Sequence, residues 1–141
     1  MIVEGYLMLP AIFSIKGLTL TPDERALFKR ADPVGFIIFG KNKDVHNIDT
    51  PDQARALIAD LKNTVGRDCP ILIDQEGGRV ARLKPPYYPT FPTFESFGNT
   101  YRDNPDRARA ELVASTAAMA EILNTLGVNV NCSPVADLRH I

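Results

Sequence analysis

Residues 71–83 read Ile71-Leu72-Ile73-Asp74-Gln75-Glu76-Gly77-Gly78-Arg79-Val80-Ala81-Arg82-Leu83. In this stretch an apolar run passes directly into a turn that is dense in acids, glycines and arginines. Short apolar runs without strict alternation are typical of parallel strands that are covered on both faces. Similar runs lie at residues 10–15, 34–39 and 128–132. The sequence therefore predicts about four parallel strands, with a polar turn at the end of the third.

Three helices are predicted between these strands. Two of them begin at a Thr-Pro-Asp sequence that is followed by Glu or Gln, which is the pattern of a capping box. The long third helix begins at Asn-Pro-Asp. Glycines end the second and third helices. The predicted helices run from Thr21 to about Arg30, from Thr50 to Gly66 and from Asn104 to Gly127. Strands that alternate with helices indicate an α/β fold, in which the carboxyl ends of parallel strands meet at one ligand-binding edge.

The composition excludes several classes of function. With 45% hydrophobic and 23% charged residues among 141, the chain can bury a core, so it is not expected to be disordered. Sixteen basic and seventeen acidic side chains leave no strong field to attract a phosphate backbone, so we predict no nucleic acid partner. The sequence has no apolar run of about 18 residues, so we predict no membrane partner.

Cysteine usage and the first residues bear on location. Cys69 and Cys132 each lie beside an apolar run, and two cysteines are too few for a disulfide scaffold, so both are expected to be reduced core residues. The amino-terminal residues have neither the basic region nor the cleavage site of a signal peptide. We therefore predict a cytoplasmic location.

The turn after the third strand has two interpretations. Asp74 and Glu76 lie two residues apart, and Arg79 and Arg82 lie three apart. A carboxylate there can accept hydrogen bonds from two vicinal hydroxyls, and an arginine can hold another oxygen-rich group with its planar fork. The alternative is structural, since the same four side chains would also form a salt-bridged plug at the end of the sheet. The two interpretations are about equally supported by spacing alone, whereas a phosphate cradle is disfavoured because the glycine-rich nucleotide motifs are missing.

Other polar and aromatic residues are weaker candidates. Five aromatics in residues 85–97 are expected to pack within a long loop rather than to stack on a sugar. His46 and His140 have no partners at metal-ligand spacing, so we predict no metal site. Asp137, after the fourth strand, would either steady the arginines of the turn or cap a helix.

Three segments resemble one known family. Residues 71–83 resemble the I-D-Q-E-G-G-R-V-x-R-L signature of the bacterial β-N-acetylglucosaminidases, or β-hexosaminidases, of glycoside hydrolase family three. Residues 34–42 look like that family's V-G-G-V-I-L-F-x-x-N strand, and residues 126–137 look like its L-G-I-N-x-N-F-A-P-V-x-D strand. The resemblance extends from about Gly17 to Asp137, and its few departures lie outside the turn.

The resemblance implies a (β/α)8 TIM barrel whose members remove terminal N-acetyl-β-glucosamine from peptidoglycan-derived fragments with retention of configuration. Such a barrel needs about 250 residues. Residues 1–141 are therefore expected to form the N-terminal half of this domain, with the C-terminal half missing. The half barrel would complete itself with the missing half or by self-association.

The resemblance also implies roles for individual residues. Asp74 matches the acid that accepts hydrogen bonds from ring hydroxyls, and Arg82 matches the arginine that contacts the substrate. Glu76 and Arg79 match signature positions that we interpret as supports of the site. The family's aspartate nucleophile and its His–Asp acid/base pair fall beyond the position that matches Ile141, so no catalytic residue is assigned in this chain and no cofactor is implied.

Three alternatives remain at this point. The 141-residue chain would be a non-catalytic remnant or an assembly module whose exposed sheet edges pair with another chain. A β-glucosidase of the same family is the second choice for the substrate. A flavodoxin-like sheet is the second choice for the fold, although no phosphate-binding turn follows the first strand.

Overall fold

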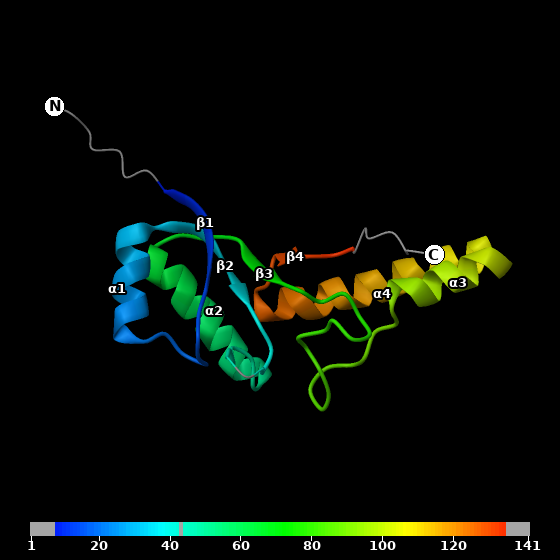
Figure 1. Ribbon diagram of the computed structural model, residues 1–141, viewed down its shortest axis with the longest axis horizontal. Coiled ribbons are helices and arrows are strands. Elements are labelled where there is room, and N and C mark those ends of the chain that lie inside the picture. Colours follow the sequence, from blue (N-terminus) through cyan, green and yellow to red (C-terminus); the bar gives the residue numbers. More distant parts are fainter. Residues whose placement is uncertain (1–7, 43, 135–141) are drawn as a thin grey trace.

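A computed structural model describes residues 8–42 and 44–134, which form four strands and four helices (Figure 1). The strands are hydrogen-bonded in the order β1-β2-β3-β4, and every pairing is parallel. The elements in chain order are β1 (Leu9–Ser14), α1 (Pro22–Ala31), β2 (Pro33–Ile38), α2 (Pro51–Val65), β3 (Ile71–Ile73), α3 (Phe94–Asp103), α4 (Pro105–Leu126) and β4 (Val130–Asn131). The predicted α/β architecture with parallel strands is confirmed.

The predicted helix boundaries follow from their caps. The Thr21 hydroxyl accepts a hydrogen bond from the Glu24 backbone N–H at 3.1 Å, and the Glu24 carboxylate accepts one from the Thr21 N–H at 2.9 Å. This is the reciprocal capping box, which satisfies two amides that the first turn leaves unpaired. Helices α2 and α4 end at Gly66 and Gly127, whose φ angles of 71° and 86° lie in the left-handed region that favours glycine.

Helix α3 is not among the three helices that the sequence predicts, since its first residues lie in the segment predicted to be a long loop. Thr93 caps it by accepting a hydrogen bond from the Ser96 N–H at 3.2 Å. None of its residues is buried, and it packs mainly against α4, so that the two helices project beyond the sheet (Figure 1). A short helix that contains Gly98 and Asn99 has low intrinsic propensity, which is why its pattern gives little signal.

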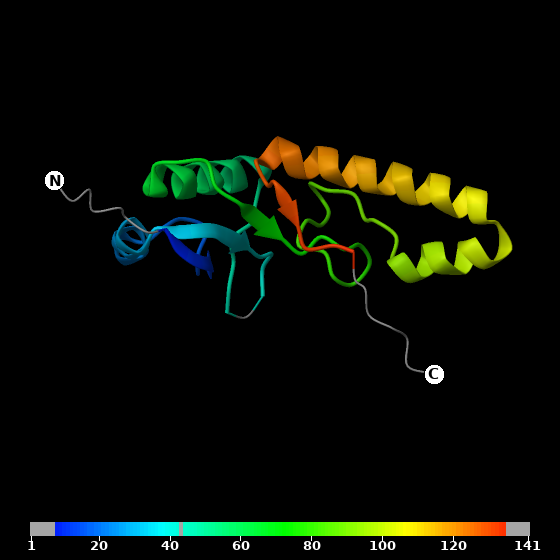
Figure 2. The same cartoon turned by 90° about the horizontal axis from the view of Figure 1, so that it is seen from above.

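Among the described residues, helices cover one face of the sheet and leave the other open. Figure 2 shows α2 and α4 on the same side of the strands. The strand side chains that share this face are 0% exposed: Phe36, Ile38, Ile71 and Ile73. On the opposite face Ile37 lies beside Leu72, which lies beside Val130, and Val130 is 38% exposed. The prediction that both faces are covered is therefore wrong for the described residues; in a closed barrel, side chains of the remaining strands fill this inner face.

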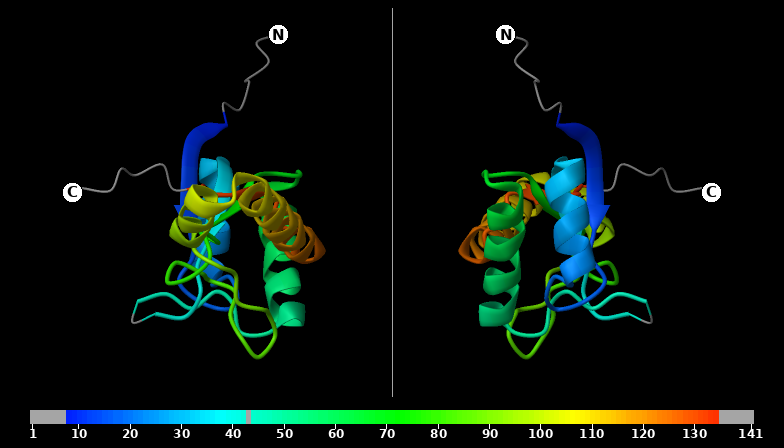
Figure 3. Two further views of the ribbon diagram at one scale, coloured as in Figure 1. Left: turned by 90° about the vertical axis from the view of Figure 1, so that its right-hand side faces the viewer. Right: turned by 90° about the vertical axis from the view of Figure 1, so that its left-hand side faces the viewer.

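The covered face forms the core. The Phe28 ring of α1 lies 4.9 Å from the Phe36 ring and 5.9 Å from the Phe13 ring, measured between centroids. Helices α1 and α2 lie side by side (Figure 3), and Arg25 donates two hydrogen bonds across them to the Asp60 carboxylate, at 2.6 and 2.7 Å. This hydrogen bonding by Arg25 lowers the pKa of Asp60 below its ordinary value. The sheet and its helices thus hold the strand ends in fixed positions.

No helix within residues 8–42 and 44–134 is both long enough and apolar enough to cross a membrane.

Candidate functional site

The acid–arginine turn lies at the carboxyl end of β3, as the sequence predicts. Arg82 Nη2 donates a hydrogen bond to Asp74 Oδ2 at 2.6 Å. The side chain of Asp74 is 23% exposed and that of Arg82 is 31% exposed. A ligand can therefore reach this pair from solvent, although most of both side chains is shielded.

Two neighbouring residues position the pair. The Arg82 guanidinium lies over the Phe39 ring at the end of β2, 5.4 Å from its centroid. Cys132, which follows β4, lies beside the Asp74 carboxylate, and burial together with the Asp74 charge raises the pKa of its thiol. The prediction that Cys132 is a core residue is wrong because it is exposed, whereas Cys69 is buried as predicted. Residues from the ends of three neighbouring strands therefore meet around one carboxylate.

Gln75 holds the turn from inside, a role that the sequence analysis did not predict. It is 1% exposed, and its Oε1 accepts hydrogen bonds from the N–H groups of Arg82 and Leu83 at 2.8 and 2.9 Å. Its backbone N–H and carbonyl are bound by the Asn131 side-chain amide of β4, at 3.0 and 2.9 Å. The sequence feature that could have indicated this role is the position of Gln75, a neutral amide between two acids directly after a buried strand.

The two glycines of the turn permit a close approach of the later loop. Gly77 and Gly78 have φ angles of 98° and 58°. A Cβ atom on Gly77 would lie 2.2 Å from the Pro92 carbonyl oxygen, and one on Gly78 would lie 2.2 Å from the Thr93 methyl carbon. Gly77 and Gly78 thus combine a positive φ with close approach of the later loop, and both conditions exclude a side chain.

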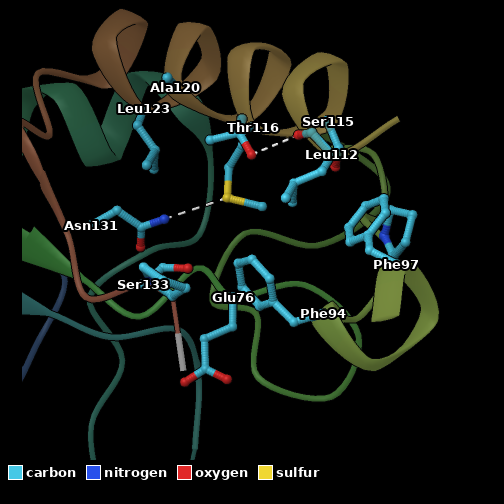
Figure 4. Close-up of a pocket in the computed structure, with 13 residues that line it drawn as sticks. Glu76, Phe94, Phe97, Leu112, Ser115, Thr116, Ala120, Leu123, Asn131 and Ser133 are labelled. Carbon is cyan, nitrogen blue, oxygen red and sulfur yellow. Dashed lines mark hydrogen bonds between the residues drawn. The ribbon is translucent and has the colours of Figure 1, made fainter. Parts of the chain in front are cut away.

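The complete four-residue plug does not form. Within the described residues, Glu76 and Arg79 make no ion pair, and Arg79 is exposed. The Glu76 backbone N–H donates to the Val80 carbonyl at 2.9 Å, while its carboxylate points away from the helices in Figure 4. Of the four charged side chains, only Asp74 and Arg82 are brought together. That Glu76 and Arg79 support the site stays a prediction.

The aromatic segment mostly packs, as predicted. Tyr88 is 8% exposed and belongs to the core, and Phe91 packs against that core. Phe94 and Phe97 line an apolar cavity, so Tyr87, at 54% exposed, is the exception.

Of the two histidines and the late acid considered above, the structure describes only His46. His46 Nε2 lies 3.8 Å from an Asp49 oxygen in the loop after β2. In the part of the chain that the structure describes, no group of three or more His, Cys, Asp or Glu side chains is placed to hold a metal ion. Asp137 and His140 lie outside the described residues.

Two cavities adjoin the turn. The first, of about 340 Å³, lies between α3, α4 and the end of β4 (Figure 4). Its walls are mainly apolar, and Asn131 Nδ2 donates a hydrogen bond to Met119 Sδ at 3.4 Å inside it. The second, of about 330 Å³, lies between the loops after β2 and β3, and Arg82 lines it. Asp74 lines neither of these two cavities, so of the two only the second has a member of the acid–arginine pair in its wall.

Fold and site together define a class of protein: an open half of an α/β barrel that carries a carboxylate–guanidinium pair at its ligand-binding edge. The chain is 32% identical over 140 residues to a β-hexosaminidase from Pseudomonas aeruginosa, a match that covers 98% of this chain and 37% of that protein. It is 30% identical over 135 residues to one from Psychromonas ingrahamii, with 95% of this chain and 37% of that protein covered. No family model matches the chain.

Solved structures show the same relation. NagZ from Neisseria gonorrhoeae in complex with a zinc ion superposes with a TM-score of 0.82 at 25% identity, covering 93% of this chain and 38% of that one. A glycoside hydrolase family 3 β-N-acetylglucosaminidase from a Paenibacillus species gives 0.74 at 25% identity, covering 87% and 22%. The chain corresponds to the N-terminal part of the β-N-acetylglucosaminidases of glycoside hydrolase family three, so the recognition made on its motifs is confirmed. It spans 37% of the length of these curated relatives.

Proposed function

We propose that this chain is the saccharide-binding half of a retaining glycoside hydrolase that removes terminal N-acetyl-β-glucosamine. The observation that carries the proposal is the Asp74–Arg82 pair, at 2.6 Å and open to solvent at the carboxyl edge of the sheet. The names of the relatives support it, and one NagZ structure was solved in complex with N-trifluoroacetyl-D-glucosamine.

The geometry suits hydroxyl recognition. An ionised carboxylate only accepts hydrogen bonds and offers about four lone-pair directions, of which Arg82 occupies one at Asp74 Oδ2. The remaining directions suit the vicinal hydroxyls of a sugar ring. The Phe39 ring and the Gln75 amide fix the side chain and backbone of Arg82, so the carboxylate is oriented before a ligand arrives.

Catalysis would need groups from outside this chain. A retaining glycosidase uses two carboxyl groups about 5 Å apart, or their equivalents, on either side of the scissile bond. The family resemblance implies that these groups follow residue 141. In our proposal Asp74 and Arg82 therefore bind and orient the sugar, and the remaining strands supply the nucleophile and the acid/base group.

The proposal extends to the setting of the reaction. We assign the substrate to peptidoglycan-derived fragments, on the family resemblance, and the location to the cytoplasm. Both described cysteines, Cys69 and Cys132, are free thiols, which supports a reducing compartment.

We also propose that residues 1–141 form a partial barrel domain that a further barrel segment or a second copy completes. The inner face of the sheet supports this, because Ile12 on β1 and Val130 on β4 are each 38% exposed. Both strands lie at an edge of the four-stranded sheet, where a further strand can pair.

The binding role is tested by substituting the pair in the completed barrel. Asp74→Asn keeps the shape but removes the anion, so hydrogen bonds worth about 1.5 to 3 kcal/mol each are weakened. We expect kcat/KM on an aryl N-acetyl-β-glucosaminide to fall at least about tenfold, with little change in Tm, and Arg82→Lys to show a milder version.

The matched control is Asp60→Asn, which breaks the Arg25–Asp60 pair of similar geometry away from the site. It should lower Tm slightly and leave kcat/KM unchanged. If instead Asp74→Asn lowers Tm and leaves kinetics normal, the pair is a structural plug and the proposed function is wrong.

A further inference from the structure

Asn47, in the loop after β2, is a polar residue that is 0% exposed. Its Oδ1 accepts a hydrogen bond from the Phe39 N–H at 2.9 Å, and its Nδ2 donates to the carbonyls of Ile15 and Gly17 at 2.9 and 3.0 Å. A buried amide that is paired in this way fixes the segments it joins, because breaking a bond leaves a buried polar group unsatisfied. Asn47 therefore ties the end of β1 to the end of β2.

Asn47 binds both backbone polar groups of Phe39. Phe39 follows β2 directly, beyond Ile38, the last residue of that strand that pairs with β3. Its N–H donates to the Asn47 side chain, and its carbonyl accepts from the Asn47 backbone N–H at 3.2 Å. The position of Phe39 is therefore set by Asn47 where the strand pairing has ended.

Helix α2 holds Asn47 in turn. Gln53, in the first turn of α2, donates from Nε2 to the carbonyls of Asn47 and Leu18, at 3.1 and 2.7 Å. Its Oε1 accepts from the Asp49 N–H at 2.9 Å. The loop that carries Asn47 is thus fixed to a helix, and a site supported by a helix is held more exactly than one supported by a loop alone.

The Phe39 ring supports the guanidinium of Arg82. The guanidinium carbon lies 5.4 Å from the ring centroid, and Nη2 is bonded to Asp74 at 2.6 Å. The Arg82 Nε is buried and has no hydrogen-bond partner in the described structure. The orientation of the guanidinium therefore depends on Asp74 at one edge and on the Phe39 ring at its face.

We propose that Asn47 is a positioning residue of the saccharide site, which acts by holding the Phe39 ring against the Arg82 guanidinium. It touches no substrate, and its effect on binding passes through the ring. A small displacement of a binding group far from the reacting atoms is enough to slow an enzyme. This inference rests on the proposed function, and it adds a residue of the loop after β2 to that site.

The test measures kcat and KM of the completed barrel on an aryl N-acetyl-β-glucosaminide, well below the lowest Tm of the variants. Asn47→Ala should raise KM about fivefold with kcat little changed, because Arg82 contributes binding rather than bond breaking. The matched control is Asn129→Ala. Asn129 also binds backbone through its amide, to Ile71 N–H at 2.7 Å and Cys69 carbonyl at 3.2 Å, but at the amino end of β3. It should lower Tm and leave KM unchanged.

A second substitution tests the route through the ring. Phe39→Leu should raise KM by a similar factor, and adding Asn47→Ala to it should raise KM less than about 1.5-fold further, because the ring is already absent. The Tm losses of the two substitutions should still add. Asn47→Asp keeps the acceptor for the Phe39 N–H and loses the donors to β1, so it should lower Tm but keep KM near normal.

The outcomes separate this inference from the proposed function. A normal KM in Asn47→Ala or in Phe39→Leu overturns the positioning role, and so do KM changes that multiply in the double variant. If Asn47→Ala does not fold, Asn47→Asp and Phe39→Leu decide, since a KM raised equally in both overturns the inference. Normal kinetics in Asp74→Asn overturn the proposed function, whereas a loss there with a normal KM in Asn47→Ala overturns this inference alone.

Discussion

Asp74 and Gln75 are neighbours in the chain, yet their side chains lie in opposite environments. Gln75 is 1% exposed, and every polar atom of its side chain is bonded to the backbone of Arg82 or Leu83. The Asp74 side chain is 23% exposed and bonded to one guanidinium nitrogen. We call Gln75 and Gly77 the inner side of the turn, and Asp74 and Arg82 its outer side. The inner side holds the structure, which leaves the outer side available for a ligand.

The difference explains why no four-residue plug is needed. A neutral amide such as that of Gln75 can close the end of a strand with modest desolvation cost, because its Oε1 accepts two hydrogen bonds and its Nε2 donates one. Burying two ion pairs for the same purpose would cost several kcal/mol per ion before any gain. The charges of Asp74 and Arg82 are therefore better explained by ligand binding than by closure of the end of the strand.

The strongest test of the inner side is Gly77→Ala. A positive φ costs a non-glycine residue about 1 to 3 kcal/mol, and the new Cβ would lie 2.2 Å from the Pro92 carbonyl oxygen. Backbone cannot rotate away as a side chain can. We expect the free energy of unfolding, measured with urea, to fall by about 4 kcal/mol or more.

Two other glycines serve as controls for Gly77. At Gly66 φ is 71° but no atom lies within 4 Å of the added Cβ, so Gly66→Ala should cost only the strain, about 1 kcal/mol. Gly98 lies within α3 with open space around it, so Gly98→Ala should stabilise by up to about 1 kcal/mol. Equal losses at Gly77 and Gly66 would show that the close approach to Pro92 does not matter.

Gln75→Leu tests the inner side without changing the backbone. It leaves the N–H groups of Arg82 and Leu83 without their acceptor, and Leu83 is 2% exposed. An unsatisfied buried N–H costs about 1 to 3 kcal/mol, so we expect a loss of about 2 to 4 kcal/mol in urea unfolding. Asp74→Asn, one residue away, should lose less than about 1 kcal/mol. If the two variants lose the same amount, the proposed division between the sides of the turn is wrong.

The sequence predicted the parts of this molecule that local patterns control. The strand runs, the caps at Thr21 and Thr50 and the glycine ends are short-range signals, and the structure confirms them. The family motif selected Asp74 and Arg82 as substrate-contacting residues, but the ion pair between them was not predicted, since spacing alone also allowed pairs with Glu76 or Arg79.

What the sequence did not predict depends on contacts between distant residues. Asn131 reaches Gln75 across 56 positions, and no periodic pattern reports such a bond. The open face of the sheet was also missed, because Ile37 and Leu72 have the same apolar character as their fully buried neighbours. Whether a strand side chain is covered depends on the layer above it, which its own sequence does not contain.

The smallest expected effect, a change in the alkylation rate of Cys132, reports on the outer side alone. Cys132 is exposed as a residue, but partial burial of its thiol and the adjacent Asp74 carboxylate raise the pKa of that thiol. At a given pH, less of it is therefore thiolate than in an ordinary cysteine. Asp74→Asn removes the charge, which should lower the pKa and increase the thiolate fraction. Because nucleophilicity falls as thiol pKa falls, the net gain in rate with iodoacetamide near pH 8 should be only about two- to threefold.

The rate should be followed by peptide mass spectrometry across a series of pH values, with buried Cys69 as the internal control that does not change. In the Asp74→Asn variant the midpoint of the pH profile should shift downward. Adding N-acetylglucosamine should slow Cys132 alkylation in the unsubstituted chain, because a sugar at Asp74 covers the thiol, and should have little effect in the variant. If the pH profiles with and without the Asp74 charge are identical, the Cys132 thiol and the Asp74 carboxylate are not neighbours in solution. The description of the outer side would then be wrong.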